Sequence, residues 1–261
     1  YEINLQQVEG DNYLQKHDLK ENSALIKNDN LLLSNVNLNW DLDESNLSTS
    51  FKVFEDLSRN HRDRYQYIFP DYNFSKNVLI PRSYNGRFNF NSYGYNKNYN
   101  TNIMESVITN DFLFTSNQHV NTKGIISKYD ILLKNSNSYS KNSTGFKEDG
   151  DYDLFSTFKI DASLPLQKKL LKYKHYLTPK VSFKYSPDKN SNLSSKNLLL
   201  NYNNIFGLNR IGASHEVEGG ESLSVGLEFK RENIEGFNIL DLKLGNVLRL
   251  KENNNLPVKS K

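Results

Sequence analysis

Hydrophobic and polar residues alternate one by one through much of this chain. In the clearest case, Leu223, Val225, Leu227 and Phe229 fall on one face of an extended segment. The opposite face carries small or charged residues: Ser222, Ser224, Gly226, Glu228 and Lys230. A period of two predicts a β-strand whose two faces meet different environments. These environments are either a protein core and water, or lipid and a wet lumen.

A second segment predicts a β-hairpin. Leu38, Trp40 and Leu42 share one face of a first strand, and residues 47–53 return with the same alternation after a turn at residues 43–46. The turn leaves no room for a crossover helix, so the strands are expected to be antiparallel. Along the whole chain the pattern predicts roughly 12 to 16 short strands and no convincing amphipathic helix.

Two further local predictions follow from composition. Pro70 cannot donate a backbone hydrogen bond, so it is expected at a strand start, a sheet edge or a bulge. Residues 135–153 are rich in Ser, Asn, Lys and Gly, which predicts a long protruding loop.

Composition narrows the function classes. Of the 261 residues only 36% are hydrophobic, yet 12% are aromatic, which excludes a disordered chain. The net charge of +3 comes from well-mixed charges, so nucleic acid is not an expected partner. There is no cysteine, no apolar run long enough for a membrane helix, and no motif for catalysis, a metal or a cofactor. The chain begins at Tyr1 without a Met or a signal peptide, and we expect a fragment of a longer protein.

The polar faces favour a lumen over bulk water. They are rich in Ser, Asn, Thr and Gly rather than in Lys and Glu, while the other faces are rich in Tyr, Phe and Leu, as in membrane barrels. We therefore predict an all-β fold, an antiparallel transmembrane β-barrel, with a soluble β-domain as the alternative. The phase of the strands predicts these lumen-facing residues: Lys52, Lys180, Lys184, Ser222, Ser224, Glu228 and Lys230.

These lysines have two interpretations. They attract anionic head groups or pair with a plug inside the barrel, or each is a solvated charge without a specific role. The segment with Arg210, Glu216, Glu218 and Gly219-Gly220 also has two interpretations, of which the surface turn is the preferred one. It forms either an inward-pointing network that fixes a loop, or a surface turn in which the glycines supply unusual backbone angles.

Five motifs, in a fixed order, resemble those of the LptD family (also called OstA or Imp), in its C-terminal barrel domain. Residues 11–19 are similar to its D-x-T-Y-L-x-x-Y-D strand entry, with Asn12 and His17 as departures. The family-signature residues of the other four motifs are Arg64, Gln66 and Pro70; Pro165 and Pro179; Asn209, Arg210, Glu218, Gly219 and Gly220; and Gly245 and Arg249. In the fourth motif His215-Glu216 replaces the family's Asp-Arg pair.

The resemblance implies that residues 1–261 are a single region within a very large barrel, a partial, open portion with two unpaired edge strands. The N-terminal periplasmic domain and the final strands are expected to be absent. It also implies a non-enzymatic, cofactor-free translocon in the outer membrane of a Gram-negative bacterium, which inserts lipopolysaccharide into the outer leaflet. The implied partners are lipopolysaccharide, outer-membrane lipid, an LptE-like lipoprotein plug, and a periplasmic Lpt bridge reached through the missing N-terminal domain. The alternatives are a porin or autotransporter barrel, or a soluble β-sandwich adhesin.

Overall fold

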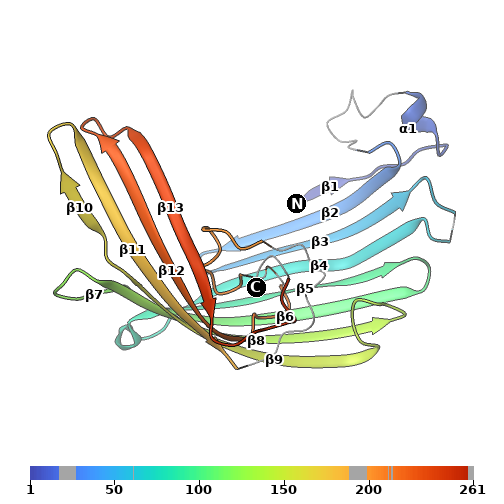
Figure 1. The fold of residues 1–261 in the computed structure, drawn as a ribbon. Helices are drawn as coiled ribbons and strands as arrows, with labels where there is room; N and C mark the ends of the chain where they lie inside the picture. The colour runs from blue at the N-terminus through green and yellow to red at the C-terminus, as the bar shows by residue number, and fades with distance from the viewer. Residues whose placement is uncertain (18–27, 61, 188–198, 211, 213, 258–261) are drawn as a thin grey trace. The chain divides into compact units, whose positions relative to one another are not determined.

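The fold is a β-sheet of 13 strands in a computed structural model, which describes residues 1–17, 28–60, 62–187, 199–210, 212 and 214–257 (Figure 1). The described elements are β1 (Glu2–Asn4), α1 (Tyr13–Lys16), β2 (Leu31–Leu42), β3 (Ser45–Asp56), β4 (Tyr65–Val78), η1 (Arg82–Tyr84), β5 (Gly86–Tyr99), β6 (Ile103–Ser116), β7 (His119–Val120), β8 (Ile126–Lys141), β9 (Asp149–Ser163), β10 (Leu166–Lys169), β11 (Tyr173–Ser186), β12 (Gly220–Asn233) and β13 (Asn238–Arg249).

Nearly all described elements are strands of one sheet, which confirms the all-β prediction. Along the main path of the sheet, the strands follow one another in sequence order. The path runs β1-β2-β3-β4-β5-β6-β8-β9-β11-β12-β13, with β7 beside β8 and β10 beside β11. Each pair whose register is described is antiparallel. The long strands have 12 to 16 residues, more than the nine to eleven that a tilted strand needs to cross a bilayer.

The chain divides into two compact units. Unit 1 comprises Tyr1–Asn77, Phe90–Asn110 and Asn135–Asp153, and unit 2 comprises Val78–Asn89, Asp111–Lys134 and Leu154–Lys261.

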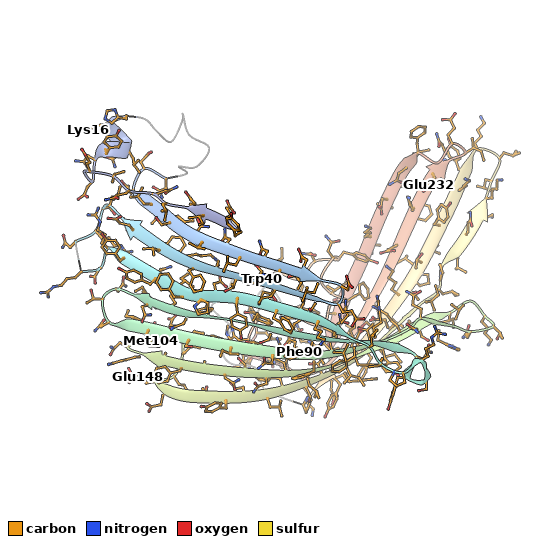
Figure 2. The ribbon with its side chains drawn as sticks, turned by 180° about the vertical axis from the view of Figure 1, so that it is seen from behind. Lys16, Trp40, Phe90, Met104, Glu148 and Glu232 are labelled. Atoms are coloured by element: carbon orange, nitrogen blue, oxygen red, sulfur yellow. The ribbon has the colours of Figure 1, made fainter. Side chains whose placement is uncertain are left out.

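Unit 1 contains the predicted hairpin and the predicted bulge. In the β2–β3 pair, Trp40 lies opposite Leu47, and Figure 2 shows side chains such as Trp40 along these strands. In the β3–β4 pair, Ser50 pairs with Asp71 while Lys52 pairs with Ile68. Residues 69 and 70 therefore lie opposite residue 51 alone, and Pro70 sits in a bulge as predicted.

The beginning of unit 1 differs from the predicted strand entry. Residues 13–16 form the single helical turn α1, so the expectation of a strand is wrong there, and residues 18 and 19 lie outside the described part. The helical turn allows Leu14 to pack against Leu32 and Leu57 in a small buried cluster. Burial of these three leucines outweighs the local extended pattern.

The predicted loop at residues 135–153 is also wrong over most of its length. Strand β8 continues to Lys141 and β9 begins at Asp149, which leaves a connection of residues 142–148. Ser136 and Ser140 are buried whereas Tyr139 is exposed, so the strand alternation persists through the Asn/Ser-rich segment. Pairing with a neighbouring strand has overridden the turn preference of these residues.

In unit 2, two prolines mark a break in the pairing of β11. Strand β9 pairs with β11 from Lys180 onward, and β10 pairs with it only up to Leu177. Pro179 lies between these two segments, and its carbonyl oxygen accepts a hydrogen bond of 3.1 Å from the Leu164 amide, next to Pro165. Pro179 therefore falls where the ladder changes partner, which explains a proline between two paired strands.

Candidate functional site

Burial in unit 2 is the reverse of that in a soluble domain. On the outer face of β11 and β13, Val181 and Leu244 are 38% and 68% exposed. On the inner face, Ser182 and Ser224 are 3% and 2% exposed. The register places these inner residues directly opposite one another on β11 and β12. The apolar face is thus the open one, and the polar face is the covered one.

The cover is the connection between β11 and β12. We call its described residues, 199–210, 212 and 214–219, the inner loop. Ile205, Val217 and Glu218 in this segment are at least 95% buried. The inner loop therefore lies on the polar face of its own sheet.

Two glycines make room for the inner loop. Gly226 on β12 pairs with Gly245 on β13, so both face the inner loop at the same height. A Cβ at Gly226 would lie 2.5 Å from the ring of Phe206, and one at Gly245 would overlap Ile205. The absence of side chains at this pair lets Tyr202, Ile205 and Phe206 approach the backbone of the sheet.

Buried lysines fasten the inner loop along its length. Lys159 on β9 donates to the Phe206 carbonyl oxygen at 2.9 Å, and Lys134 on β8 donates to the Ser214 carbonyl oxygen at 2.7 Å. Each lysine also pairs with strand carboxylates: Lys159 with Asp130 and Asp161, and Lys134 with Asp111. These pairs offset part of the cost of burying the ammonium groups.

The end of the inner loop is held by a buried charge cluster. Arg210 donates two hydrogen bonds to the Glu218 carboxylate, of 2.7 and 2.8 Å, and further ones to Ser222 and Ser224, of 2.6 and 3.1 Å. Lys184 reaches Glu218 at 3.3 Å, and Arg249 also contacts it. A two-pronged arginine–carboxylate contact is the strongest geometry for such a pair.

These cations keep Glu218 ionised. Burial by itself opposes the negative charge, but the positive charges of Lys184, Arg210 and Arg249 and the Arg210 hydrogen bonds outweigh it. Together they lower the pKa of Glu218 to about 2. Glu218 is therefore a carboxylate at any physiological pH.

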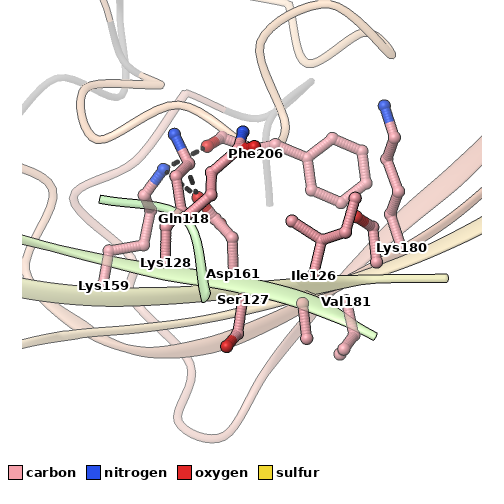
Figure 3. A pocket seen from close by; sticks show the side chains of 11 residues that line it. Gln118, Ile126, Ser127, Lys128, Lys159, Asp161, Lys180, Val181 and Phe206 are labelled. Atoms are coloured by element: carbon pink, nitrogen blue, oxygen red, sulfur yellow. Dashed lines mark hydrogen bonds and ion pairs between the residues drawn. The ribbon is translucent and has the colours of Figure 1, made fainter. Parts of the chain in front are cut away.

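A cavity of about 260 Å³ lies beside the inner loop. Figure 3 shows the ring of Phe206 above Ile126, with Lys128, Lys159 and Asp161 grouped to one side. Lys180 lines the cavity as well and pairs with Glu228 at 2.6 Å. The cavity thus combines paired charges with an apolar wall.

Unit 1 has a polar groove with a different character. Its volume is about 460 Å³, and it is lined mainly by neutral amides and hydroxyls with Lys52 and Asp71. These two side chains form an ion pair of 2.5 Å. Tyr65, Tyr67 and Phe69 on the opposite face are exposed; the rings of Tyr65 and Tyr67 are stacked at 6.1 Å, and Phe69 lies tilted against Tyr67 at 5.8 Å.

The structure brings part of the predicted residues together. Arg210, Glu218, Lys184, Arg249 and the pair Ser222/Ser224 form one buried network. The surface-turn interpretation is therefore wrong for Arg210 and Glu218, although Gly220 has the unusual backbone angle that it expected, with a φ of +97°. The other members of the predicted set lie apart from this network. They are Lys180 and Glu228, paired with each other; Lys230, paired with Glu232; Gly219 and Gly220, at the entry to β12; Asn209, whose side chain accepts from the Gly212 amide; Gly245, under Ile205; Pro165 and Pro179, at the ladder break; and Lys52, Arg64, Gln66 and Pro70, in unit 1.

Arg64 forms a second set of ion pairs between separate segments, in unit 1. It is 9% exposed and contacts Asp11 and Glu55 at 2.7 Å each. It thereby ties the segment before α1 to the end of β3.

Sequence reasoning missed the buried lysines Lys134 and Lys159 and the acceptor Asp130. The signal was present, because each alternates with exposed apolar neighbours such as Ile131, Leu133 and Ile160. A lysine in phase with small polar residues on a two-faced strand indicates the covered face here.

A family model described as LptD, LPS transport system D, matches residues 1–261. No curated protein matches the chain. None of the helices in the described residues is long and apolar enough to cross a membrane.

Proposed function

The chain belongs to the LptD family, whose function is lipopolysaccharide transport at the outer membrane, and from this premise we propose that residues 1–261 form one region of a channel wall. The channel inserts lipopolysaccharide into the outer leaflet of a Gram-negative outer membrane. The transport is non-catalytic: the wall excludes lipid on one face and offers polar groups on the other.

The reversed burial in unit 2 carries this proposal. Exposed residues such as Val225, Leu227 and Leu248 cost free energy in water, on the order of 25 cal/mol per Å² of apolar surface. In hydrocarbon the same residues are well solvated, and the antiparallel ladders satisfy the backbone polar groups that lipid cannot. The arrangement therefore suits a wall between lipid and a polar interior.

The polar interior suits the partners that the family suggests. An LptE-like lipoprotein plug and the sugar head groups of lipopolysaccharide both need hydrogen-bonding partners. The groove in unit 1, with Asn37, Ser50, Lys52 and Asp71, supplies neutral and charged ones. A periplasmic Lpt bridge would deliver the glycolipid through a further domain of the full-length protein.

Depletion of the full-length protein in its host tests this function. We expect newly made lipopolysaccharide to stop reaching the cell surface, measured by surface labelling of intact cells. A copy of the gene under separate control should restore the labelling. Unrelated outer-membrane barrels serve as the control for general assembly. Normal surface labelling of lipopolysaccharide after depletion would show that the protein has another function.

A further inference from the structure

Three cationic side chains share the carboxylate of Glu218, and they come from different parts of unit 2. Lys184 belongs to β11 and Arg249 to β13, whereas Arg210 belongs to the inner loop itself. All three side chains are at least 88% buried. The carboxylate thus occupies a position that two strands and the loop surround with positive charge.

The strand register aligns the groups that the sheet contributes around the carboxylate. Lys184 lies directly opposite Ser222, and Ser222 lies directly opposite Arg249. Lys159 continues the same row, since it lies opposite Lys184 on β9. The row therefore places an ammonium group, a hydroxyl and a guanidinium side by side on one face, across β11, β12 and β13.

The carboxylates that contact the buried lysines differ in origin. Lys159 and Lys134 contact Asp130 and Asp111, which lie on strands β8 and β6. The carboxylate that contacts Lys184 belongs to Glu218, in the inner loop. The strands thus bring carboxylates of their own to Lys159 and Lys134, but the loop delivers the anion to Lys184.

We propose that Lys184, Ser222 and Arg249 form an anion-binding site on the inner wall, and that Glu218 occupies it in place of a phosphate-bearing ligand. Arginine with lysine and a hydroxyl donor matches the oxygens of a phosphate group. Glu218 presents one carboxylate oxygen to Lys184 and the other to Arg249, while the Ser222 hydroxyl accepts a hydrogen bond from Arg210. Glu218 thus acts as an internal competitor for the two cationic groups. The site itself does not depend on the proposed function, but the identity of its ligand as a phosphorylated glycolipid rests on it.

Binding of diphosphorylated lipid A to the purified full-length protein in detergent tests the site. Glu218→Gln keeps the shape of the side chain but removes the competing charge, so affinity should rise roughly tenfold. Lys184→Gln should weaken binding by a similar factor, and the double variant should lose the gain. Lys180→Gln is the matched control, because Lys180 lies four residues away on the same face and pairs with Glu228.

Two further probes identify the ligand chemistry. Phosphate-free lipid A should bind all variants equally, because it lacks the group that the site recognises. Competition by inorganic phosphate at millimolar concentration shows that the site takes free phosphate. If phosphate does not compete but the variants still change the binding of diphosphorylated lipid A alone, the site takes the phosphate group only as part of the lipid.

The proposal is overturned if Glu218→Gln and Lys184→Gln bind diphosphorylated lipid A like the wild type, or if they change the binding of both lipids alike. Heat-modifiable migration shows whether each variant is folded. If Glu218→Gln does not fold, Lys184→Gln with its Lys180 control decides alone. A changed phosphate affinity together with normal lipopolysaccharide export after depletion would retain the site and refute only the proposed function.

Discussion

Arg210 holds the inner loop through the geometry of its side chain as well as through its charge. Its guanidinium contacts Glu218, Ser222 and Ser224 at once. An ammonium group cannot reproduce this planar fork. We expect Arg210→Lys to destabilise the packed inner loop by roughly 2 to 4 kcal/mol, which limited proteolysis of the folded full-length protein measures as faster cleavage within residues 199–219.

The matched control for this variant is Arg59→Lys in unit 1. Arg59 pairs with Asp56, but its side chain is 52% exposed, and exposed pairs contribute about 0 to 1 kcal/mol. Equal cleavage rates for the two variants would show that charge alone holds the inner loop.

Acid should release the inner loop through Glu218. Its pKa is about 2 in the folded chain, against an ordinary value of 4.5. The folded pKa is the lower one, so the stabilisation is present above pH 4.5 and is lost as the pH falls toward 2. The shift corresponds to about 3 kcal/mol. We expect pepsin cleavage of the inner loop to rise steeply across this range.

Glu218→Gln provides the comparison, because it cannot titrate. Cleavage of this variant should be high already at pH 4.5. Below pH 4.5, its cleavage rate should follow only the activity of the protease. A wild-type profile parallel to that of Glu218→Gln would assign the acid sensitivity to other groups.

Among the elements, β12 and β13 depend on their glycine pair. Gly226→Ala places a methyl group 2.5 Å from the Phe206 ring, and overpacking of this kind costs about 1 to 3 kcal/mol. We expect faster hydrogen exchange in residues 199–210, and partial recovery in the double variant with Phe206→Leu. Gly10→Ala is the control, since its Cβ would meet open space. Unchanged exchange in Gly226→Ala would show that the ring moves aside without cost.

The elements also show where sequence reasoning succeeds. The hairpin β2–β3 and the bulge at Pro70 were predictable, because alternation and the missing amide of proline act locally. The end of β8 was not, because Asn and Ser prefer turns in isolation and only the neighbouring strand overrides that preference. The inner loop was missed for a related reason. Arg210 and Ser222 meet only through the fold, so the sequence pattern favoured a surface turn over the inward network.

At the scale of the whole molecule, the outer face should require apolar residues. Leu227 lies on this face and is 37% exposed. A lysine at the bilayer midplane costs about 2 to 4 kcal/mol, so Leu227→Lys should lower the folded, heat-modifiable fraction in isolated outer membranes. Thr178→Lys is the control, because residue 178 lies opposite Glu228 on the polar face. Equal loss in both variants would mean that the two faces do not differ in this way.

The family was also predictable from the sequence, because its motifs keep their order along the chain, and the match to residues 1–261 confirms it. The grouping of the motif residues was not predictable. Arg210, Glu218 and Arg249 converge in one network, while Arg64 serves unit 1 through Asp11 and Glu55. The order of the motifs identifies the family, but only the register of the strands brings separate motifs into contact.

The glycine pair under the inner loop restricts which residues can replace it and its partners among related sequences. Gly226 faces Phe206, and Gly245 faces Ile205, so neither partner can enlarge unless the other shrinks. Among relatives that keep the inner loop, positions 206 and 226 should covary in volume, as should 205 and 245. A relative that carries a large residue at 226 should therefore have a small one at 206, or a loop that no longer lies on the sheet.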